Sequence, residues 1–308
     1  MDNNAPACPV CRITAQPYFN DIDYILECGR CGIIFDMRSS LDKKYYEKER
    51  STHVDKDKIR SRERNVSQRA ALIKGFLYKE ASVLDIGCGE GLFLKEIKRY
   101  VADIQGLEPT EFYADYARIE LKIDVIQGMI EDTDFPEASF NIITMFHVLE
   151  HFQDPGMALG KISRWLKPGG CLVIEVPDIS SPYARYKGPA WELIIPEHRF
   201  HFTLKSLTGL LQRHNFIPAI TRNRDFDQYR VGIGESMRKL LPFSAKIKKS
   251  EKVIRQTKIK KNSPHKEGKQ YVKNIRRSAQ LPLKAFLGWL VYKFRRGDYL
   301  FVVAKKTR

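Results

Sequence analysis

Residues 83–92, VLDIGCGEGL, are the stretch that decides the fold. A short apolar run ends in three glycines at alternate positions, Gly87, Gly89 and Gly91, and an amphipathic segment follows. Glycine has no Cβ, so a turn of this kind lets the backbone approach a ligand closely. The stretch therefore predicts a strand, a ligand-binding turn and a helix, although nicotinamide and flavin sites use similar turns.

Two acidic side chains narrow the class of ligand. Asp85 precedes the glycines at the end of the predicted strand, and Glu108 ends the next predicted strand, in IQGLEPT. An acidic side chain about 20 residues after such a turn can accept hydrogen bonds from ribose hydroxyls. An acid ahead of the glycines suits a ligand that carries an ammonium group better than one that carries a pyrophosphate.

Strands and helices alternate along the chain after residue 81. We expect strands at 82–86, 104–107, 125–127, 140–145, 171–176, 216–220 and 299–304, and helices at 92–99, 111–121, 157–166 and 204–214. Such alternation predicts an α/β fold, a Rossmann-like doubly wound and mostly parallel sheet with helices on both faces. Ligands of these sheets bind beyond the carboxyl ends of the strands.

Four of the six cysteines form two CxxC pairs near the N-terminus, Cys8 with Cys11 and Cys28 with Cys31. This spacing predicts a small ribbon that holds zinc between four thiolates, and the alternative is two unrelated pairs. Because four thiolates leave no open coordination position, the zinc would be structural. Cys88 and Cys171 lie in apolar contexts and are expected in the core rather than on a metal.

Several motifs, in their order along the chain, resemble those of class I S-adenosylmethionine-dependent methyltransferases. They are VLDIGCGEGLFL, GLEPT, SFNIITMFHVLEHF, LKPGGCLVIEVPD and the terminal DYLFVVAKK, and the likeness covers about residues 80–225 and the last strand. The ribbon followed by LDKKYYEKE is similar to a subgroup whose members often accompany sugar and surface-polysaccharide enzymes. The resemblance implies methyl transfer from S-adenosylmethionine.

The resemblance also implies which residues bind this cofactor. The three glycines would frame its methionine part with Asp85 near the ammonium group, and Glu108 would hold the ribose. The chain has Gly128-Met129 where the family often has Gly-Asp, so Glu131 is the candidate for contact with the adenine amine. The full implied set is Asp85, Gly87, Cys88, Gly89, Gly91, Glu108, Met129 and Ile130.

A candidate catalytic cluster follows the strand at 140–145, in FHVLEHF at 146–152. In an α-like turn His147, Glu150 and His151 would share one face, because side chains three and four positions apart are neighbours. A histidine there could deprotonate a methyl acceptor, since its pKa lies near neutrality. A metal site and a purely structural turn are the two alternatives.

His198, in PEHRFHFT at 196–203, is the expected complement of this cluster. Together they resemble plant small-RNA 2′-O-methyltransferases and ubiquinone-pathway O-methyltransferases. There a Glu-x-x-Glu-His stretch, joined in the RNA enzymes by a later histidine, binds a divalent metal beside the acceptor hydroxyl. His147 stands in place of the first glutamate, which would favour zinc, manganese or iron over magnesium.

The net charge of +16 is unevenly distributed. Residues 81–229 carry −6 and residues 230–308 carry +19. We expect four parts: a zinc ribbon at 1–40, a helical connector at 41–80, a methyltransferase domain at 81–229 with 298–308, and a basic helical insertion at 230–297. The insertion is a solvated surface, an RNA-binding patch or a contact with an anionic membrane surface.

The expected reaction is methyl transfer to a hydroxyl of a small molecule or glycan, namely a sugar, a nucleotide sugar or a lipid-linked glycan. RNA methylation is the alternative, with the ribbon and the basic segment binding RNA, and a non-catalytic binding module is a third hypothesis. No RNA-binding motif with stacking aromatic residues is visible. The sequence shows no membrane span or signal peptide, so we expect a cytoplasmic protein, with peripheral membrane contact as a further alternative.

Overall fold

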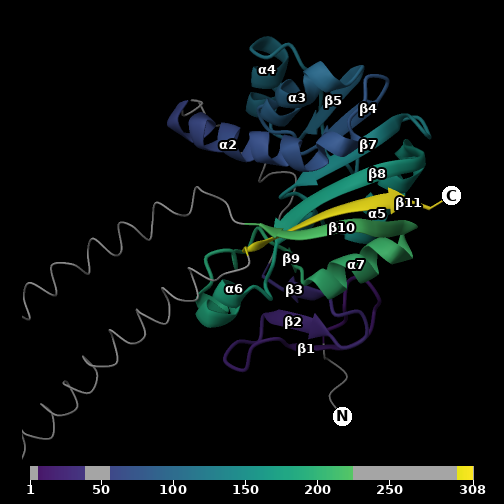
Figure 1. Ribbon diagram of the computed structural model, residues 1–308. Helices are drawn as coiled ribbons and strands as arrows, with labels where there is room; N and C mark the ends of the chain where they lie inside the picture. The colour runs from purple at the N-terminus through teal and green to yellow at the C-terminus, as the bar shows by residue number, and fades with distance from the viewer. Residues whose placement is uncertain (1–5, 39–55, 225–296, 308) are drawn as a thin grey trace, which may run out of the picture. The chain divides into compact units, whose positions relative to one another are not determined.

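The computed structural model describes residues 6–38, 56–224 and 297–307. The described residues all belong to one compact unit (Figure 1). Almost all of the predicted basic insertion at 230–297 lies outside them, as does the first part of the predicted connector at 41–80. The structure therefore bears on the ribbon, the second half of the connector and the predicted methyltransferase domain.

The described helices and strands follow the predicted alternation, with short 3-10 helices labelled η. They are β1 (Ala15–Pro17), β2 (Ile25–Cys28), β3 (Ile34–Asp36), α2 (Lys56–Ile73), η1 (Lys74–Phe76), β4 (Ser82–Ile86), α3 (Leu92–Ile97), η2 (Lys98–Tyr100), β5 (Asp103–Glu108), α4 (Glu111–Ile119), β6 (Asp124–Gln127), β7 (Phe140–Phe146), η3 (Leu149–His151), α5 (Pro155–Trp165), β8 (Leu166–Pro177), α6 (Pro182–Lys187), η4 (Gly188–Ala190), β9 (Phe200–His201), α7 (Leu204–Arg213), β10 (Phe216–Arg224) and β11 (Tyr299–Lys306).

A seven-stranded sheet forms the centre of the molecule, with strand order β10-β11-β8-β7-β4-β5-β6. The pairings from β8 through β7, β4 and β5 to β6 are all parallel. The last strand, β11, lies antiparallel between β8 and β10. The predicted doubly wound, mostly parallel sheet is confirmed.

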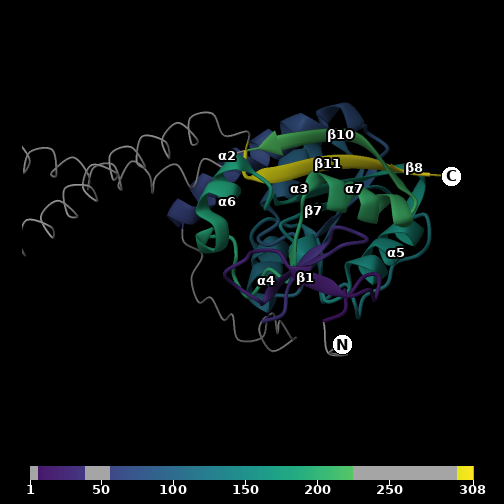
Figure 2. The same ribbon diagram turned by 90° about the horizontal axis from the view of Figure 1, so that it is seen from below.

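Two apolar layers cover the two faces of this sheet, as alternation of side chains along each strand requires. On β4, Val83 packs with buried residues of α2, α3 and α4. Its neighbour Leu84 points to the opposite face, where residues of α5 and α7 pack together with residues of the N-terminal ribbon. Figures 1 and 2 show α2 and α3 on one side of the sheet and α5, α7 and the ribbon strands on the other.

The ribbon is continuous with a strand of the predicted methyltransferase domain. Strands β1, β2 and β3 form an antiparallel sheet whose fourth strand is β9, a two-residue strand that follows α6. Neither β9 nor α6 is predicted from the sequence, because segments of two and six residues are too short to show a clear periodic pattern. The residues predicted as a separate small domain at 1–40 therefore share hydrogen bonds and core with the rest of the unit.

Candidate active site

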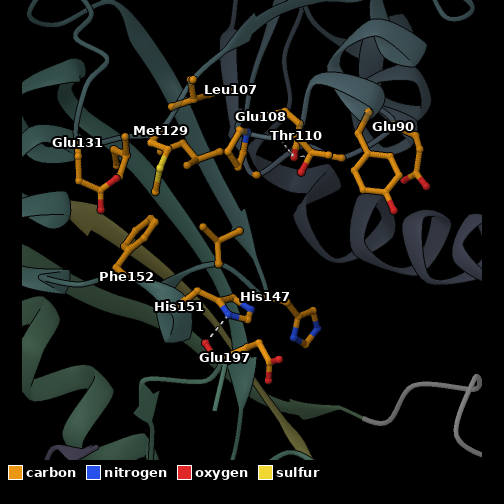
Figure 3. A pocket seen from close by; sticks show the side chains of 18 of the residues that line it. Glu90, Leu107, Glu108, Thr110, Met129, Glu131, His147, His151, Phe152 and Glu197 are labelled. Atoms are coloured by element: carbon orange, nitrogen blue, oxygen red, sulfur yellow. Dashed lines mark hydrogen bonds between the residues drawn. The ribbon is translucent and has the colours of Figure 1, made fainter. Parts of the chain in front are cut away.

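One cavity opens at the carboxyl ends of β4, β5, β6 and β7, where the fold predicts a ligand site. It is lined by Arg62, Ile86, Gly87, Gly89, Glu90, Leu107, Glu108, Pro109, Thr110, Tyr113, Gly128, Met129, Ile130, Glu131, His147, Val148, His151, Phe152, Gln153 and Glu197. Figure 3 shows Glu90, Glu108 and Thr110 at one end and His147, His151 and Glu197 at the other. Most of the predicted ligand-binding residues thus share one cavity with His147 and His151, whereas Glu150 and His198 do not line it.

Gly87 lies in the wall of the cavity, close to Val148. Its φ is 68°, and a Cβ there would lie 2.4 Å from Cγ2 of Val148. Gly89 and Gly91 also have positive φ, and Gly91 precedes the first residue of α3. The predicted glycine turn is therefore present, and at Gly87 both the backbone conformation and the close approach of Val148 require glycine.

Glu108 joins the glycine turn to the end of β5. Its Oε2 accepts a hydrogen bond from the backbone N–H of Gly89 at 2.8 Å, and its Oε1 accepts one from Thr110 at 2.9 Å. A carboxylate offers about four lone-pair positions, so it can still accept hydrogen bonds from two ribose hydroxyls. Burial raises the pKa of Glu108, and the two backbone donors oppose that shift.

Asp85 lies behind the cavity wall rather than in it. The side chain is buried, and Oδ1 accepts a hydrogen bond from the hydroxyl of Thr144 at 2.6 Å. Burial raises the pKa of Asp85 to about 7. Of the other predicted ligand-binding residues, Cys88 and Gly91 also do not line the cavity. Cys88 and Cys171 are buried in the core, as predicted.

Met129, Ile130 and Glu131 line the side of the cavity that follows β6. Ile130 is buried, and Oε2 of Glu131 is buried without a hydrogen-bond partner among the described residues. A buried acceptor without a donor is unfavourable, and an amino group of a ligand would supply one. This end of the cavity therefore fits the amine-bearing adenine ring that the sequence predicts there.

Sequence reasoning missed three charged residues of the cavity, Arg62, Glu90 and Glu197. Arg62 projects from α2, and its guanidinium forms an ion pair with Glu90 of the glycine turn. Arg62 is the one Lys or Arg among the described residues that line this cavity, whose acids include Glu108 and Glu131. An acidic cavity with a single guanidinium fits a cationic ligand that carries one carboxylate, as S-adenosylmethionine does.

His147 corrects the predicted α-like turn. Its backbone is left-handed with φ of 61°, and the residues that follow form the 3-10 helix η3. Its Nδ1 lies 3.3 Å from Oε1 of Glu150 and its Nε2 lies 3.2 Å from Oε1 of Glu175. Burial opposes the positive charge, but the two carboxylates raise the pKa of His147. Both ring nitrogens of His147 are thus engaged by carboxylates, which leaves neither of them directed at a methyl acceptor.

The carboxylate of Glu175 contacts His147 and also two arginines. Arg69 of α2 donates to its Oε1 at 2.7 Å, and Arg224 at the end of β10 donates to its Oε2 at 2.6 Å. Burial opposes ionisation, yet the surrounding Arg69, His147 and Arg224 lower the pKa of Glu175 to about 2. This network connects three elements that are distant in the sequence, and it orients the ring of His147.

One group of candidate metal ligands, separate from the ribbon cysteines, consists of Glu150, His151 and His198. Their donor atoms lie within 4.8 Å of one another. Nδ1 of His151 donates to the carbonyl of Glu197 at 2.7 Å, and Nδ1 of His198 donates to that of Leu193 at 2.8 Å. In the neutral rings both Nε2 atoms are therefore free of protons. Carbonyl acceptors on Nδ1 are the usual second contact of histidines that bind metals.

The carboxylate of Glu150 completes this group. It is fully buried, and neither oxygen accepts a hydrogen bond from any described residue except for the 3.3 Å contact with His147. Burial opposes ionisation, but His147 and the neighbouring histidines hold the pKa of Glu150 below its usual value. His147 belongs to the predicted set but not to the group, because its ring is turned toward Glu175 as well.

The four ribbon cysteines come together as the spacing predicts. Their sulfur atoms lie within 4.8 Å of one another, with Cys8 to Cys31 at 3.6 Å and Cys11 to Cys28 at 3.3 Å. All four are free thiols. Tetrahedral zinc with Zn–S bonds of about 2.3 Å places its sulfurs roughly 3.8 Å apart, so the cluster fits a zinc ion.

A family model for a methyltransferase domain matches residues 38–217, which is more than half of the chain. The chain belongs to this methyltransferase family. Its sheet order, its glycine turn and the acidic end of β5 are those of the class I S-adenosylmethionine-dependent fold. The residues that line the cavity therefore belong to a methyltransferase domain whose cofactor is S-adenosylmethionine.

Curated relatives of this methyltransferase include ubiquinone biosynthesis O-methyltransferases. That of Bradyrhizobium sp. strain ORS 278 is 35% identical over 98 residues, which are 30% of this chain and 38% of that protein. That of Nitrobacter winogradskyi is 29% identical over 158 residues, which are 50% of this chain and 57% of that protein. The chain thus spans less than two thirds of the length of these relatives.

Solved structures show the same fold. A chain of the complex between the Haloferax volcanii Trm112 methyltransferase activator and a putative methyltransferase is 13% identical with a TM-score of 0.51, covering 87% of this chain and 100% of that chain. A SAM-dependent methyltransferase from Archaeoglobus fulgidus is 17% identical with a TM-score of 0.50, covering 79% and 94%. Among its described residues, this methyltransferase has no helix that is long and apolar enough to cross a membrane.

Proposed function

We propose that this methyltransferase transfers the methyl group of S-adenosylmethionine to a hydroxyl oxygen. The observation that carries the proposal is the shared cavity, whose two ends hold Glu108, the residue expected to bind the ribose, and His151. The ubiquinone-pathway relatives are named as O-methyltransferases, which supports oxygen as the acceptor. A sugar, nucleotide sugar or lipid-linked glycan is the proposed acceptor class, from the resemblance of the ribbon to a sugar-associated subgroup.

The residues at the first end would bind the cofactor as follows. Glu108 would accept hydrogen bonds from the ribose, and Glu131 would accept one from the adenine amine between Met129 and Ile130. Arg62 would bind the carboxylate of the methionine part. Asp85 would act from behind the glycine turn, where its charge favours the ammonium group without direct contact.

Beside the other end, we propose that Glu150, His151 and His198, of which His151 lines the cavity, hold a divalent metal. The donor set of two neutral imidazoles and one carboxylate suits zinc, manganese or iron. Such an ion would lower the pKa of an acceptor hydroxyl. His147 would hold Glu150 in position through its charge, because its own nitrogens face the two carboxylates.

Incubation with methyl-labelled S-adenosylmethionine and fractionated cell extract tests the reaction. We expect label in a glycan or small-molecule fraction, in a form that resists mild base as ethers do. Label in RNA would instead support the alternative acceptor. If calorimetry shows that neither S-adenosylmethionine nor S-adenosylhomocysteine binds, the proposed function is wrong.

Metal analysis of purified protein tests the second ion. A variant with all four ribbon cysteines changed to serine should lose about one zinc per chain. The second divalent ion, which we expect beside the ribbon zinc in the wild-type protein, should be lost in His198→Ala, which keeps all four ribbon cysteines. His214→Ala, a histidine outside the cluster, is the matched control. A wild-type protein that holds no more than one metal ion per chain after loading with Mn²⁺ or Zn²⁺ would leave direct proton transfer to His151 as the explanation.

A further inference from the structure

We propose that the four-cysteine ribbon is a positioning element for the His198 side of the active site. The inference rests on the proposed function, since it assigns a role to the segment that carries Glu197 and His198. Both lie between α6 and β9, which the sequence places far from the ribbon. Three sets of contacts connect this segment to the ribbon.

The first contact is a backbone pairing on the C-terminal side of His198. Strand β3 of the ribbon pairs with β9, with Ile34 opposite His201 and Phe35 opposite Phe200. The N–H of Asp36 also donates to the carbonyl of Arg199 at 2.9 Å. The residue directly after His198 is therefore hydrogen-bonded to the strand that follows the second CxxC pair.

The second contact is an apolar cluster on the N-terminal side of His198. Ile25 and Ile34 of the ribbon are fully buried against Ile179, Ala184 and Trp191. The partly buried residues that pack on this cluster come from both parts, and they are Tyr18, Phe19, Ile22, Tyr24, Tyr183, Leu193 and Ile194. The segment that leads to His198 thus packs on the ribbon before β9 pairs with it.

The third set runs from this segment to the proposed metal ligands. The carbonyl of Leu193 holds Nδ1 of His198, and the carbonyl of Glu197 holds Nδ1 of His151. These two hydrogen bonds orient the rings so that both Nε2 atoms are available for an ion. Because both carbonyls belong to the segment braced by the ribbon, its backbone position determines the orientation of two ligands.

The cysteine cluster holds the ribbon itself. Its strands have three or four residues each, and such short strands are not stable alone. Zinc between four thiolates supplies the folding energy that the small core lacks. Loss of the ion should therefore loosen β3 and, through it, the segment at 193–202, while β4 and β5 keep their places within the seven-stranded sheet and their packing on α2, α3 and α4.

Hydrogen exchange with mass spectrometry tests this coupling. We expect Cys28→Ser, or chelation of zinc from the wild-type protein, to speed exchange in peptides covering 193–202 at least tenfold. Exchange at 82–108 should remain within twofold, as should the affinity for S-adenosylhomocysteine measured by calorimetry. Mn²⁺ affinity should fall at least tenfold, and added zinc should restore both properties to the chelated protein.

Cys171→Ser is the matched control, since this buried cysteine lies outside the cluster. It should leave exchange at 193–202 unchanged. Unchanged exchange at 193–202 after verified zinc loss would overturn the proposal. Faster exchange everywhere with loss of S-adenosylhomocysteine binding would overturn it too, because the ribbon would then support the whole unit. A wild-type protein that binds no cofactor would contradict the proposed function, whereas the exchange result stands independently of it.

Discussion

Gly87 shows how one residue sets the cavity. Its left-handed backbone and the methyl group of Val148 leave no room for a side chain. Valine is stiff at χ1, so Val148 cannot swing aside easily. We expect Gly87→Ala to destabilise the protein by about 1–3 kcal/mol and to weaken S-adenosylhomocysteine binding at least tenfold, in thermal unfolding and calorimetry respectively.

Gly160→Ala is the matched control for this substitution. Gly160 lies in α5, and a Cβ there would meet nothing within 4 Å. An alanine should therefore stabilise the helix by roughly 0.5–1 kcal/mol and leave ligand affinity unchanged. Wild-type affinity in Gly87→Ala would show that the loop adapts and that the glycine is not required.

Asp85 predicts a pH dependence of stability for the ligand-free protein. Its folded pKa of about 7 lies above the unfolded value of about 3.9. The folded state therefore binds the proton more tightly, and stability falls as pH rises from about 4 to 7 and is level above that. Asparagine does not titrate, so Asp85→Asn should not show this fall in stability. Its stability relative to the wild type should therefore rise between about pH 4 and 7.

Urea unfolding of both proteins at pH 4.5, 6 and 8 measures this difference. The free energy of unfolding of Asp85→Asn, relative to the wild type, should rise by about 1.4 kcal/mol for each unit by which the folded and unfolded pKa values of Asp85 differ. If the two proteins differ in free energy of unfolding by the same amount at all three pH values, burial does not disfavour the ionised form of Asp85 in the folded protein. The physical cause is burial, because Thr144 is the one hydrogen-bond donor found for this carboxylate among the described residues.

At the scale of elements, helix α2 contributes to the cavity although it precedes the first strand of the main sheet. Arg62 pairs with Glu90 from this helix and faces the ligand end. We expect Arg62→Ala to weaken S-adenosylhomocysteine binding roughly fivefold, since a partly exposed ion pair contributes about 1 kcal/mol. Calorimetry measures the change, and removal of the ligand carboxylate should remove the difference between the two proteins.

Arg99→Ala is the control for Arg62→Ala, because Arg99 is an exposed arginine paired within its own turn. It should bind the ligand as the wild type does. If Arg62→Ala also binds with unchanged affinity, the guanidinium serves Glu90 alone. Helix α2 would then be a cover for the core and not part of the cofactor site.

At the scale of the whole molecule, the ends of β10 and β11 lie side by side. Arg224 is the register partner of Tyr299, and the backbone of Gly297 approaches that of Arg224. A short linker can therefore join the two strands. We propose that the basic segment at 230–297 contacts anionic membranes and is not needed for the cofactor site, so replacing residues 226–295 with a Gly/Ser linker should keep S-adenosylhomocysteine affinity within twofold.

Co-sedimentation with vesicles of anionic lipid tests the other half of this prediction. The full chain should sediment with such vesicles at low salt, and the linker variant should stay in the supernatant, because residues 230–308 carry +19. Vesicles of neutral lipid are the control. Loss of ligand binding in the linker variant would mean that the segment belongs to the cofactor site.

The sequence by itself determined the class of fold, the ligand turn and the cysteine cluster. Each depends on residues close together in the chain: the period of apolar side chains, glycines at alternate positions, and cysteine pairs separated by two residues. The predicted strand over 82–86 agrees with β4, and the other strands differ at their ends by a few residues. Local patterns report such features because backbone geometry and side-chain alternation act over short distances.

Only the tertiary structure decided which residues meet. Arg62 reaches the cavity by packing of a helix, and His147 is held between Glu150 and Glu175, the latter 28 residues further along. The ribbon is joined to the segment of His198 by a two-residue strand that has no sequence pattern. Contacts between distant parts depend on how complete elements pack, and one sequence contains no periodic sign of that packing.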